Sequence, residues 1–204
     1  MARPFPAPMS TYRTLAARSR FTAPPIKGSR FFATAAPVRT EEEALALVTE
    51  VEAELSEARH HCWAFRLRAE GRTRCSDAGE PGGSAGRPIL ARLEGKDLSD
   101  AVVVVSRIYG GTKLGVGGLI RAYGGTAGQA LDAAEILEVR ETTTLVVVHA
   151  YDDTRAIEAA LAGVEVLDAH YGAEVRRTLS VPVEEVAPLE EALRSATRGG
   201  ARFE

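Results

Sequence analysis

The sequence predicts an α+β protein built from two small domains, with a boundary near residues 138–142. Helically spaced apolar residues alternate irregularly with short β-branched runs, which is typical of this class. The charge balance changes at the same place. Residues 142–204 carry 11 acidic and six basic side chains, whereas residues 1–141 carry 17 acidic and 19 basic side chains. We therefore expect an N-terminal domain over residues 10–138 and an acidic C-terminal domain over residues 142–204.

Composition restricts the class of protein further. Hydrophobic residues make up 45% and charged residues 26% of the 204 residues, as in an ordinary soluble globular protein. No stretch approaches 18 apolar residues and the N-terminus lacks a signal-peptide core, so we expect a cytoplasmic protein with no membrane partner. The two cysteines, Cys62 and Cys75, are too few for a disulfide framework or a cysteine-based zinc site.

The N-terminal domain is expected to begin with β structure and a helix. Thr40 is a favourable N-cap and Glu43 completes a capping box, so a helix should run from Glu41 to about Ala58. Alternating apolar residues and flanking turn residues predict strands on both sides of this helix. The expected strands are Phe21–Thr22, Arg30–Phe32 and Cys62–Arg68.

Two glycine-rich loops surround an apolar strand in the middle of the chain. The first loop covers residues 76–88 and leads into a short helix at residues 89–94. The β-branched run Ala101–Val105 predicts a buried central strand, and the second loop, Gly110–Gly118, follows it.

A longer helix is expected from Leu119 to Leu137, and it contains two glycines. Gly124 and Gly125 each cost about 1 kcal/mol relative to alanine inside a helix. We therefore expect that another part of the chain approaches the backbone closely at this point.

The C-terminal domain has the predicted element order βαββαβ. The expected strands are Thr143–Ala150, Val164–Leu167, Val175–Val181 and Ala201–Phe203. The expected helices run from Asp152 to Leu161 and from Glu184 to Thr197. This order is that of a ferredoxin-like sandwich.

The second glycine-rich loop is a candidate anion site. A buried strand leads into glycines, whose backbone N–H groups can converge, and then into a helix N-terminus with its partial positive charge. Arg107, Lys113 and Arg121 lie nearby in the sequence. The loop matches neither the P-loop motif nor the dinucleotide-binding motif. An equally favoured interpretation is that the glycines only permit tight helix–sheet packing.

The first glycine-rich loop carries the candidate catalytic carboxylates, Asp77 and Glu80. Such a loop can hold a metal ion or position a water molecule. A stiff turn with solvated charges is the favoured alternative. His60 and His61 are adjacent and should point to opposite sides of a strand, so no metal site is predicted for them.

Three segments resemble, in order, the motifs of the YigZ/IMPACT family. They are Ala58-Arg-His-His-Cys62, Ser76-Asp-Ala-Gly-Glu-Pro-Gly-Gly-Ser-Ala-Gly-Arg-Pro88 and Val104-Val-Ser-Arg-Ile-Tyr-Gly-Gly-Thr-Lys-Leu-Gly-Val-Gly-Gly-Leu-Ile-Arg-Ala-Tyr123. The resemblance covers roughly residues 18–135 of the N-terminal domain. The family usually has a second acidic residue where this chain has Ala78, and this departure weakens a metal site in the first loop.

The resemblance implies a fold for each domain. The N-terminal domain should be similar to the second domain of a small-subunit ribosomal protein, to RNase PH and to domain IV of elongation factor G. The C-terminal domain should be similar to domain V of the same factor, in agreement with the βαββαβ order. Proteins of these folds include both enzymes and RNA binders, so the fold does not decide the function.

The sequence and the resemblance favour a non-enzymatic RNA- or ribosome-associated binding protein that acts in the regulation of translation. Residues 59–121 carry 11 basic and six acidic side chains, which predicts a local basic patch. Arginines and lysines would contact phosphates, and tyrosines would stack on bases. The expected anion- or RNA-binding residues are Arg59, His60, His61, Ser76, Arg107, Tyr109, Gly110, Gly111, Lys113, Gly115, Gly117, Gly118, Arg121 and Tyr123.

Two other classes of function stay open, and no cofactor is expected. An enzyme acting on a small phosphorylated or nucleotide substrate would use Asp77 and Glu80 as acid/base groups or metal ligands. A protein–protein adaptor would bind a basic partner through the acidic residues 142–204.

Overall fold

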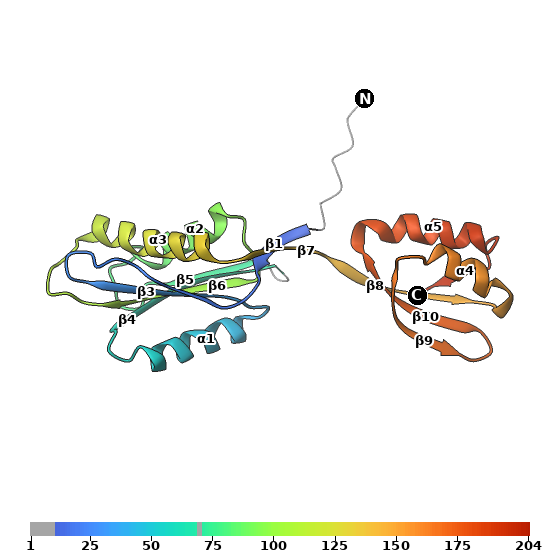
Figure 1. Ribbon diagram of the computed structural model, residues 1–204, viewed down its shortest axis with the longest axis horizontal. Coiled ribbons are helices and arrows are strands. Elements are labelled where there is room, and N and C mark those ends of the chain that lie inside the picture. The colour runs from blue at the N-terminus through green and yellow to red at the C-terminus, as the bar shows by residue number, and fades with distance from the viewer. Residues whose placement is uncertain (1–10, 69–70) are drawn as a thin grey trace, which may run out of the picture. The chain divides into compact units, whose positions relative to one another are not determined.

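The computed structural model describes residues 11–68 and 71–204. Its contacts divide this part of the chain into two compact units, residues 12–139 and residues 140–204 together with Thr11. Each unit combines a sheet with helices (Figure 1), which confirms the predicted α+β class. Position 10, where the N-terminal domain was expected to begin, lies outside the described residues.

A five-stranded antiparallel sheet forms the centre of the N-terminal unit, in the order β2-β3-β6-β4-β5. The strands are β2 (Ser19–Thr22), β3 (Arg30–Pro37), β4 (His60–Leu67), β5 (Arg72–Ser76) and β6 (Ala101–Ile108). The apolar run Ala101–Val105 occupies the central strand, as predicted, and each of its five residues is buried. Strand β6 is apolar on both sides because helices cover both faces of the sheet.

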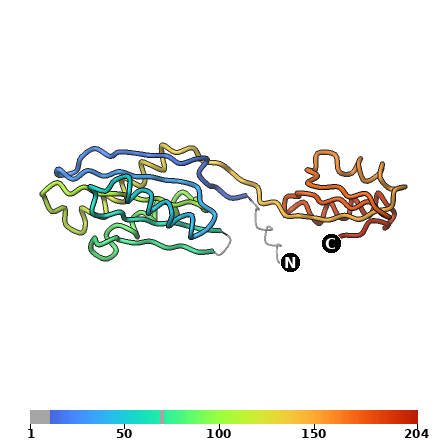
Figure 2. Tube along the Cα trace, turned by 90° about the horizontal axis from the view of Figure 1, so that it is seen from below, coloured from blue at the N-terminus to red at the C-terminus, as the bar shows by residue number. Residues whose placement is uncertain are grey.

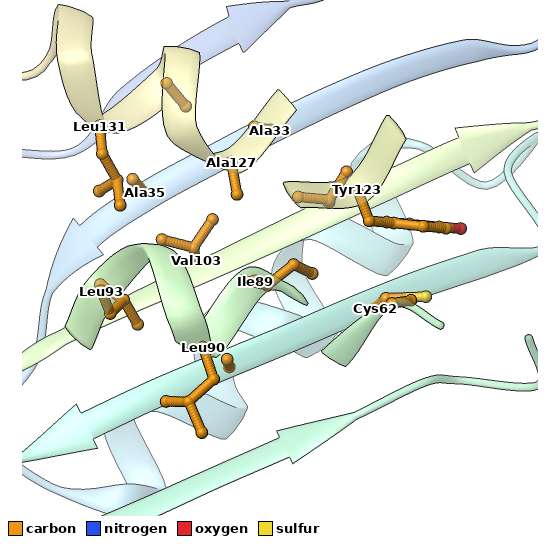
Figure 3. Packing of buried hydrophobic residues seen from close by; sticks show 14 of the residues in the cluster. Ala33, Ala35, Cys62, Ile89, Leu90, Leu93, Val103, Tyr123, Ala127 and Leu131 are labelled. Atoms are coloured by element: carbon orange, nitrogen blue, oxygen red, sulfur yellow. The ribbon is translucent and has the colours of Figure 1, made fainter. Parts of the chain in front are cut away.

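Helix α1 (Glu41–Glu54) covers one face of this sheet, and helices α2 (Gly86–Gly95) and α3 (Val116–Ala133) cover the other (Figure 1). Val102 and Val104 pack under α1, whereas Val103 and Val105 pack under α2 and α3. Figure 3 shows the second of these cores, in which Ile89 and Leu93 of α2 and Ala127 and Leu131 of α3 gather around Val103 of the sheet. The alternation along β6 therefore decides which side chains reach the α3 side.

Helix α1 begins where the capping residues predicted. The Thr40 Oγ1 accepts the N–H of Glu43 at 3.2 Å, and the Glu43 carboxylate accepts the N–H of Arg39 at 2.6 Å. The helix ends at Glu54, four residues before the expected end. A turn in which Ala58 donates its N–H to the Leu55 carbonyl replaces the last predicted turn of helix.

Three strands of the N-terminal unit were not predicted. Strand β5 is a largely exposed edge strand without an apolar face, so it carries no alternation signal. Strands β1 (Thr11–Leu15) and β7 (Ile136–Arg140) form a separate two-stranded sheet. The helix expected to reach Leu137 ends at Ala133, because the backbone becomes extended at Ala134.

The C-terminal unit has the predicted βαββαβ arrangement. Its elements are β8 (Thr142–His149), α4 (Thr154–Ala160), β9 (Glu165–Tyr171), β10 (Val175–Pro182), α5 (Val186–Ala196) and β11 (Arg202–Phe203). The antiparallel sheet has the order β11-β8-β10-β9, and both helices pack on one of its faces around Leu179 and Leu193. This is a ferredoxin-like sandwich. In the described residues, no helix combines the length and the apolar character needed to cross a bilayer.

The two glycines inside α3 have different roles. A Cβ atom on Gly124 would lie 3.4 Å from the Pro88 Cβ, and the Gly124 carbonyl accepts a hydrogen bond from Arg92 Nε at 3.1 Å. Gly124 therefore meets the expectation of a close approach, here between α2 and α3. A Cβ on Gly125 would meet nothing within 4 Å, so the expectation does not hold there.

The β2–β3 turn and the second glycine-rich loop touch through their backbones at one end of the N-terminal unit (Figure 2). A Cβ on Gly110 would lie 1.9 Å from the carbonyl carbon of Gly28 and 2.2 Å from the Ser29 nitrogen. The Ser29 Oγ also accepts the N–H of Gly110 at 3.2 Å. Only glycine fits at position 110 without separating the two segments.

We expect Gly110→Ala to lower the free energy of unfolding by about 3 kcal/mol, because a methyl group would overlap backbone atoms that cannot move independently. Gly125→Ala is the matched control. It should raise the free energy of unfolding by about 0.5–1 kcal/mol, because alanine favours a helix and has open space there. Urea unfolding monitored by circular dichroism measures both values. Equal effects of the two substitutions would contradict the packing described here.

Candidate functional site at the glycine-rich loops

Arg107 lies at the end of β6, on the side of the sheet that α3 covers. Its side chain is 6% exposed and its Nη1 donates to the Oε1 of Glu80, in the first glycine-rich loop, at 2.7 Å. The Glu80 side chain is 5% exposed, so this is a buried ion pair. The Arg107 Nη2 donates to the Ser29 Oγ at 3.3 Å, which joins the pair to the β2–β3 turn.

Tyr123 of α3 completes this arrangement. Its hydroxyl donates to the same Glu80 Oε1 at 2.8 Å, and its ring meets Phe31 edge-on at a centroid distance of 5.3 Å. Burial and the neighbouring Glu80 raise the pKa of Tyr123, so the hydroxyl remains a donor. We call Ser29, Glu80, Arg107 and Tyr123 the Glu80 cluster. Two of its members, Arg107 and Tyr123, were expected to contact RNA; within the cluster the Tyr123 hydroxyl and both Arg107 Nη atoms are already hydrogen-bonded, whereas the Arg107 Nε has no partner in the described residues.

Asp77 organises the first loop. Its carboxylate accepts three backbone N–H groups, from Gly83 at 2.7 Å and from Ala85 and Gly86 at 2.8 Å each. Burial tends to raise the pKa of Asp77, but these three hydrogen bonds outweigh it and lower the pKa below its ordinary value. Asp77 is therefore an ionised cap for the start of α2, which leaves it poorly suited to act as a general acid or base.

The adjacent histidines lie on opposite faces of β4. The His60 Nδ1 lies 2.9 Å from the Ala78 carbonyl oxygen, which can only accept, so Nδ1 is the donor in a hydrogen bond that joins the strand to the first loop. The buried His61 lies 3.1 Å from the Ala58 carbonyl through Nε2, so its Nδ1 accepts the Ser106 hydroxyl at 2.8 Å. In the described residues, no group of three or more His, Cys, Asp or Glu side chains could hold a metal ion.

Cys62 and Ser76 also stabilise the first loop through hydrogen bonds to its backbone. The Cys62 Sγ donates to the Asp77 carbonyl at 3.0 Å, and burial raises the pKa of this thiol to about 12. Ser76 Oγ accepts the N–H of Ala78 at 3.2 Å, which stabilises a turn. Cys62 lies in the same buried core as Tyr123 of α3 (Figure 3), so it is an inert core residue.

A hollow of about 250 Å³ opens between the two glycine-rich loops. Polar residues of its lining include Glu80, Arg107 and Lys113, and the ring of Tyr109, a residue that is 50% exposed, lies 5.4 Å from the Arg107 guanidinium carbon. Apolar side chains provide most of the remaining wall. The lining residues are Glu80, Pro81, Arg107, Tyr109, Lys113, Leu114, Gly115, Val116 and Leu119.

Exposed apolar and basic side chains lie at this hollow and on the neighbouring first turns of α3. Val116 and Ile120 are 53% and 42% exposed, and Lys113 and Arg121 are exposed beside them. The Arg121 Nη1 lies over Gly117, 3.6 Å from where a Cβ atom would stand. We call Tyr109, Lys113, Val116, Ile120 and Arg121 the glycine-loop surface.

The remaining predicted residues lie in or next to these loops. Gly115 has a left-handed φ of 72° and is the N-cap of α3, so Gly117 and Gly118 fall in the first turn. Gly110 and Gly111 are exposed, and Arg59 is exposed just before β4. Ser29 was missed because its signal is tertiary: it lies next to Arg107 only through the pairing of β3 with β6.

Residues 27–131 match the Impact N-terminal domain, and this stretch includes every residue of the Glu80 cluster. The chain belongs to the IMPACT family. Residues 149–199 match a second model, a domain of unknown function named DUF1949.

Members of the IMPACT family match this chain over different lengths. The family member YigZ of Escherichia coli (strain K12) is 37% identical over 183 residues, which is 87% of this chain and 90% of YigZ. A Thermus thermophilus member is 48% identical over 109 residues, 53% of this chain and 58% of its own. A solved structure described as a hypothetical protein covers 96% of this chain and 97% of its own, with 34% identity and a TM-score of 0.71.

Asp77→Asn should lower the free energy of unfolding by about 1 kcal/mol at neutral pH, the usual size of a lost cap. The folded-state pKa of Asp77 lies below its unfolded value of about 3.9, so its stabilisation is complete above that value. It is lost as the pH falls through the folded pKa. The difference between the two proteins should therefore shrink in acid, as followed by urea unfolding. A difference that stays constant with pH would contradict an ionised cap.

Glu80→Gln should lower the free energy of unfolding by about 3 kcal/mol, because it leaves the buried Arg107 guanidinium without its counter-charge. Tyr123→Phe is the matched control. It removes one hydrogen bond to the same oxygen and should cost about 1 kcal/mol. Thermal and urea unfolding measure both. If the two variants lose the same amount, the ion pair is not the main contribution of Glu80.

Proposed function

We propose that this IMPACT family member binds RNA through the glycine-loop surface, as a non-enzymatic RNA- or ribosome-associated protein in the regulation of translation. The observation that supports this most is that the exposed ring of Tyr109 and the exposed cation Lys113 line one hollow, while the exposed Arg121 lies on the neighbouring first turns of α3. Proteins that bind single-stranded RNA commonly combine aromatic stacking with cationic contacts to phosphates.

The backbone at the start of α3 adds donors to this surface. The first hydrogen bond within the helix is donated by Leu119 to the Gly115 carbonyl, so the preceding N–H groups are available to an acceptor. Gly117 has no side chain to cover them, and the helix dipole places a partial positive charge there. A phosphate held by Lys113 and Arg121 would therefore also lie near these N–H groups.

The Glu80 cluster supports this function indirectly. It contributes one positive and one negative charge, so it adds no net charge to the surface. Its hydrogen bonds to the β2–β3 turn and to α3 fix the positions of both glycine-rich loops. A prearranged surface loses less conformational entropy on binding than a mobile one, which favours affinity.

An enzymatic role for Asp77 and Glu80 has less support. Asp77 is saturated by backbone donors, and Glu80 has accepted two hydrogen bonds at one oxygen. A protein-binding role has one specific observation in its favour. Val166, Leu167 and Tyr171 of the edge strand β9 are 41%, 54% and 59% exposed in the acidic C-terminal unit.

The test is the binding of a fluorescently labelled single-stranded RNA, measured by anisotropy over a series of salt concentrations. Two phosphate contacts predict a slope of log K against log salt of about −1.4. Lys113→Ala combined with Arg121→Ala should bring the slope close to zero, and Tyr109→Ala should weaken binding by about 1–3 kcal/mol.

Arg155→Ala is the matched control, because Arg155 is an exposed arginine in the other unit. The RNA affinity and the salt slope of Arg155→Ala should equal those of the unmodified protein. Unchanged binding in both the Lys113/Arg121 and the Tyr109 variants would refute the proposed surface. If Leu167→Asp instead abolishes binding to a protein partner while no RNA binds, the adaptor role is favoured.

A further inference from the structure

The hollow beside Glu80 has the size and the polarity of a subsite for one aromatic ring system. Its volume of about 250 Å³ is below the ~300–1,000 Å³ of pockets that hold drug-sized ligands. Pro81, Leu114, Val116 and Leu119 form apolar walls. Such walls accept a flat ring, and the few polar atoms between them decide which ring binds.

Glu80 supplies the acceptor in this hollow. Its Oε1 already accepts hydrogen bonds from Arg107 and Tyr123, at 2.7 and 2.8 Å. Its Oε2 accepts no hydrogen bond from the described residues, although Glu80 lines the hollow. An ionised carboxylate can accept hydrogen bonds but cannot donate them. It therefore favours a ligand edge with N–H donors and repels one with lone pairs.

Arg107 carries an unused donor. Its Nη1 and Nη2 are engaged with Glu80 and Ser29, whereas its Nε is buried and has no partner in the described chain. The side chain is 6% exposed and lines the same hollow. A buried N–H group without a partner is unfavourable, so an acceptor on the ligand that reaches this N–H would be stabilised.

We infer that this hollow is a guanine subsite of the RNA-binding surface. Guanine is the standard base whose Watson–Crick edge has two adjacent N–H donors, at N1 and N2, followed by an acceptor at O6. The N–H groups at N1 and N2 would donate to the free Oε2 of Glu80. The O6 atom would accept the unpaired N–H of Arg107. Tyr109 and Lys113 also line the hollow. The exposed ring of Tyr109 would stack on the base, and the Lys113 ammonium group would contact the phosphate of the same nucleotide.

The inference rests on the proposed function, but it can be tested on the unmodified protein by changing the ligand. The probe is a labelled ten-nucleotide oligoadenylate that carries one central guanine. Replacing this guanine by inosine, which lacks the N2 amino group, or by 1-methylguanine should weaken binding roughly tenfold or more, toward the level of unbroken oligoadenylate. Guanosine monophosphate should bind more tightly than adenosine monophosphate, as measured by titration calorimetry.

A protein variant provides an independent readout. Tyr109→Ala changes an exposed residue outside the buried cluster, so the fold should persist, and it should weaken binding to the guanine-containing probe. The ratio between guanine and inosine probes should survive in Tyr109→Ala, because Glu80 and Arg107 are unchanged. In Glu80→Gln, provided circular dichroism shows native structure, the ratio should fall to about one.

The outcomes separate the two proposals. RNA binding with equal affinity for all probes would overturn the guanine subsite and leave RNA binding intact. Preferential binding of guanosine monophosphate without any RNA binding would retain the subsite and overturn the RNA-binding function. Failure of both the oligonucleotides and the mononucleotides to bind would overturn both.

Discussion

The buried ion pair between Glu80 and Arg107 is the interaction on which the arrangement of the site depends. Removing two charges from water is unfavourable unless the geometry is good and further hydrogen bonds satisfy the groups. Tyr123 and Ser29 provide those bonds. The four residues come from the first loop, β6, α3 and the β2–β3 turn, so one cluster fixes four segments that are distant in the sequence.

This constraint divides the polar residues of the loops into two groups. Arg107, Asp77 and Tyr123 have the chemistry expected of a site, yet the Asp77 carboxylate, the Tyr123 hydroxyl and both Arg107 Nη atoms make hydrogen bonds that hold the loops together. Tyr109 and Lys113 make few such bonds and stay exposed. The rigid group positions the exposed one, which is how loops on a stable scaffold commonly carry function.

Much of the fold could be predicted because its signals are local. The Thr40 cap, the apolar run at Ala101–Val105 and the βαββαβ order depend on patterns within short windows. Strand β5 lacks such a pattern because it is an exposed edge. Motif order located the site, but burial of Arg107 depends on Glu80, 27 residues earlier, and no local pattern reports that pairing.

The small positive charge of the glycine-loop surface limits the affinity with which it would bind RNA. Screening limits exposed charges to about 8 Å at physiological ionic strength, so the net charge of −3 need not oppose binding at the glycine-loop surface. The Glu80 pair is neutral, which leaves Lys113 and Arg121 as the cations of that surface. Two phosphate contacts and one stacked base give a modest affinity for a short free strand. Tight association would therefore require a second contact on the same large particle, whose effective concentration multiplies the first. A ribosome-associated role satisfies this requirement more readily than capture of free RNA does.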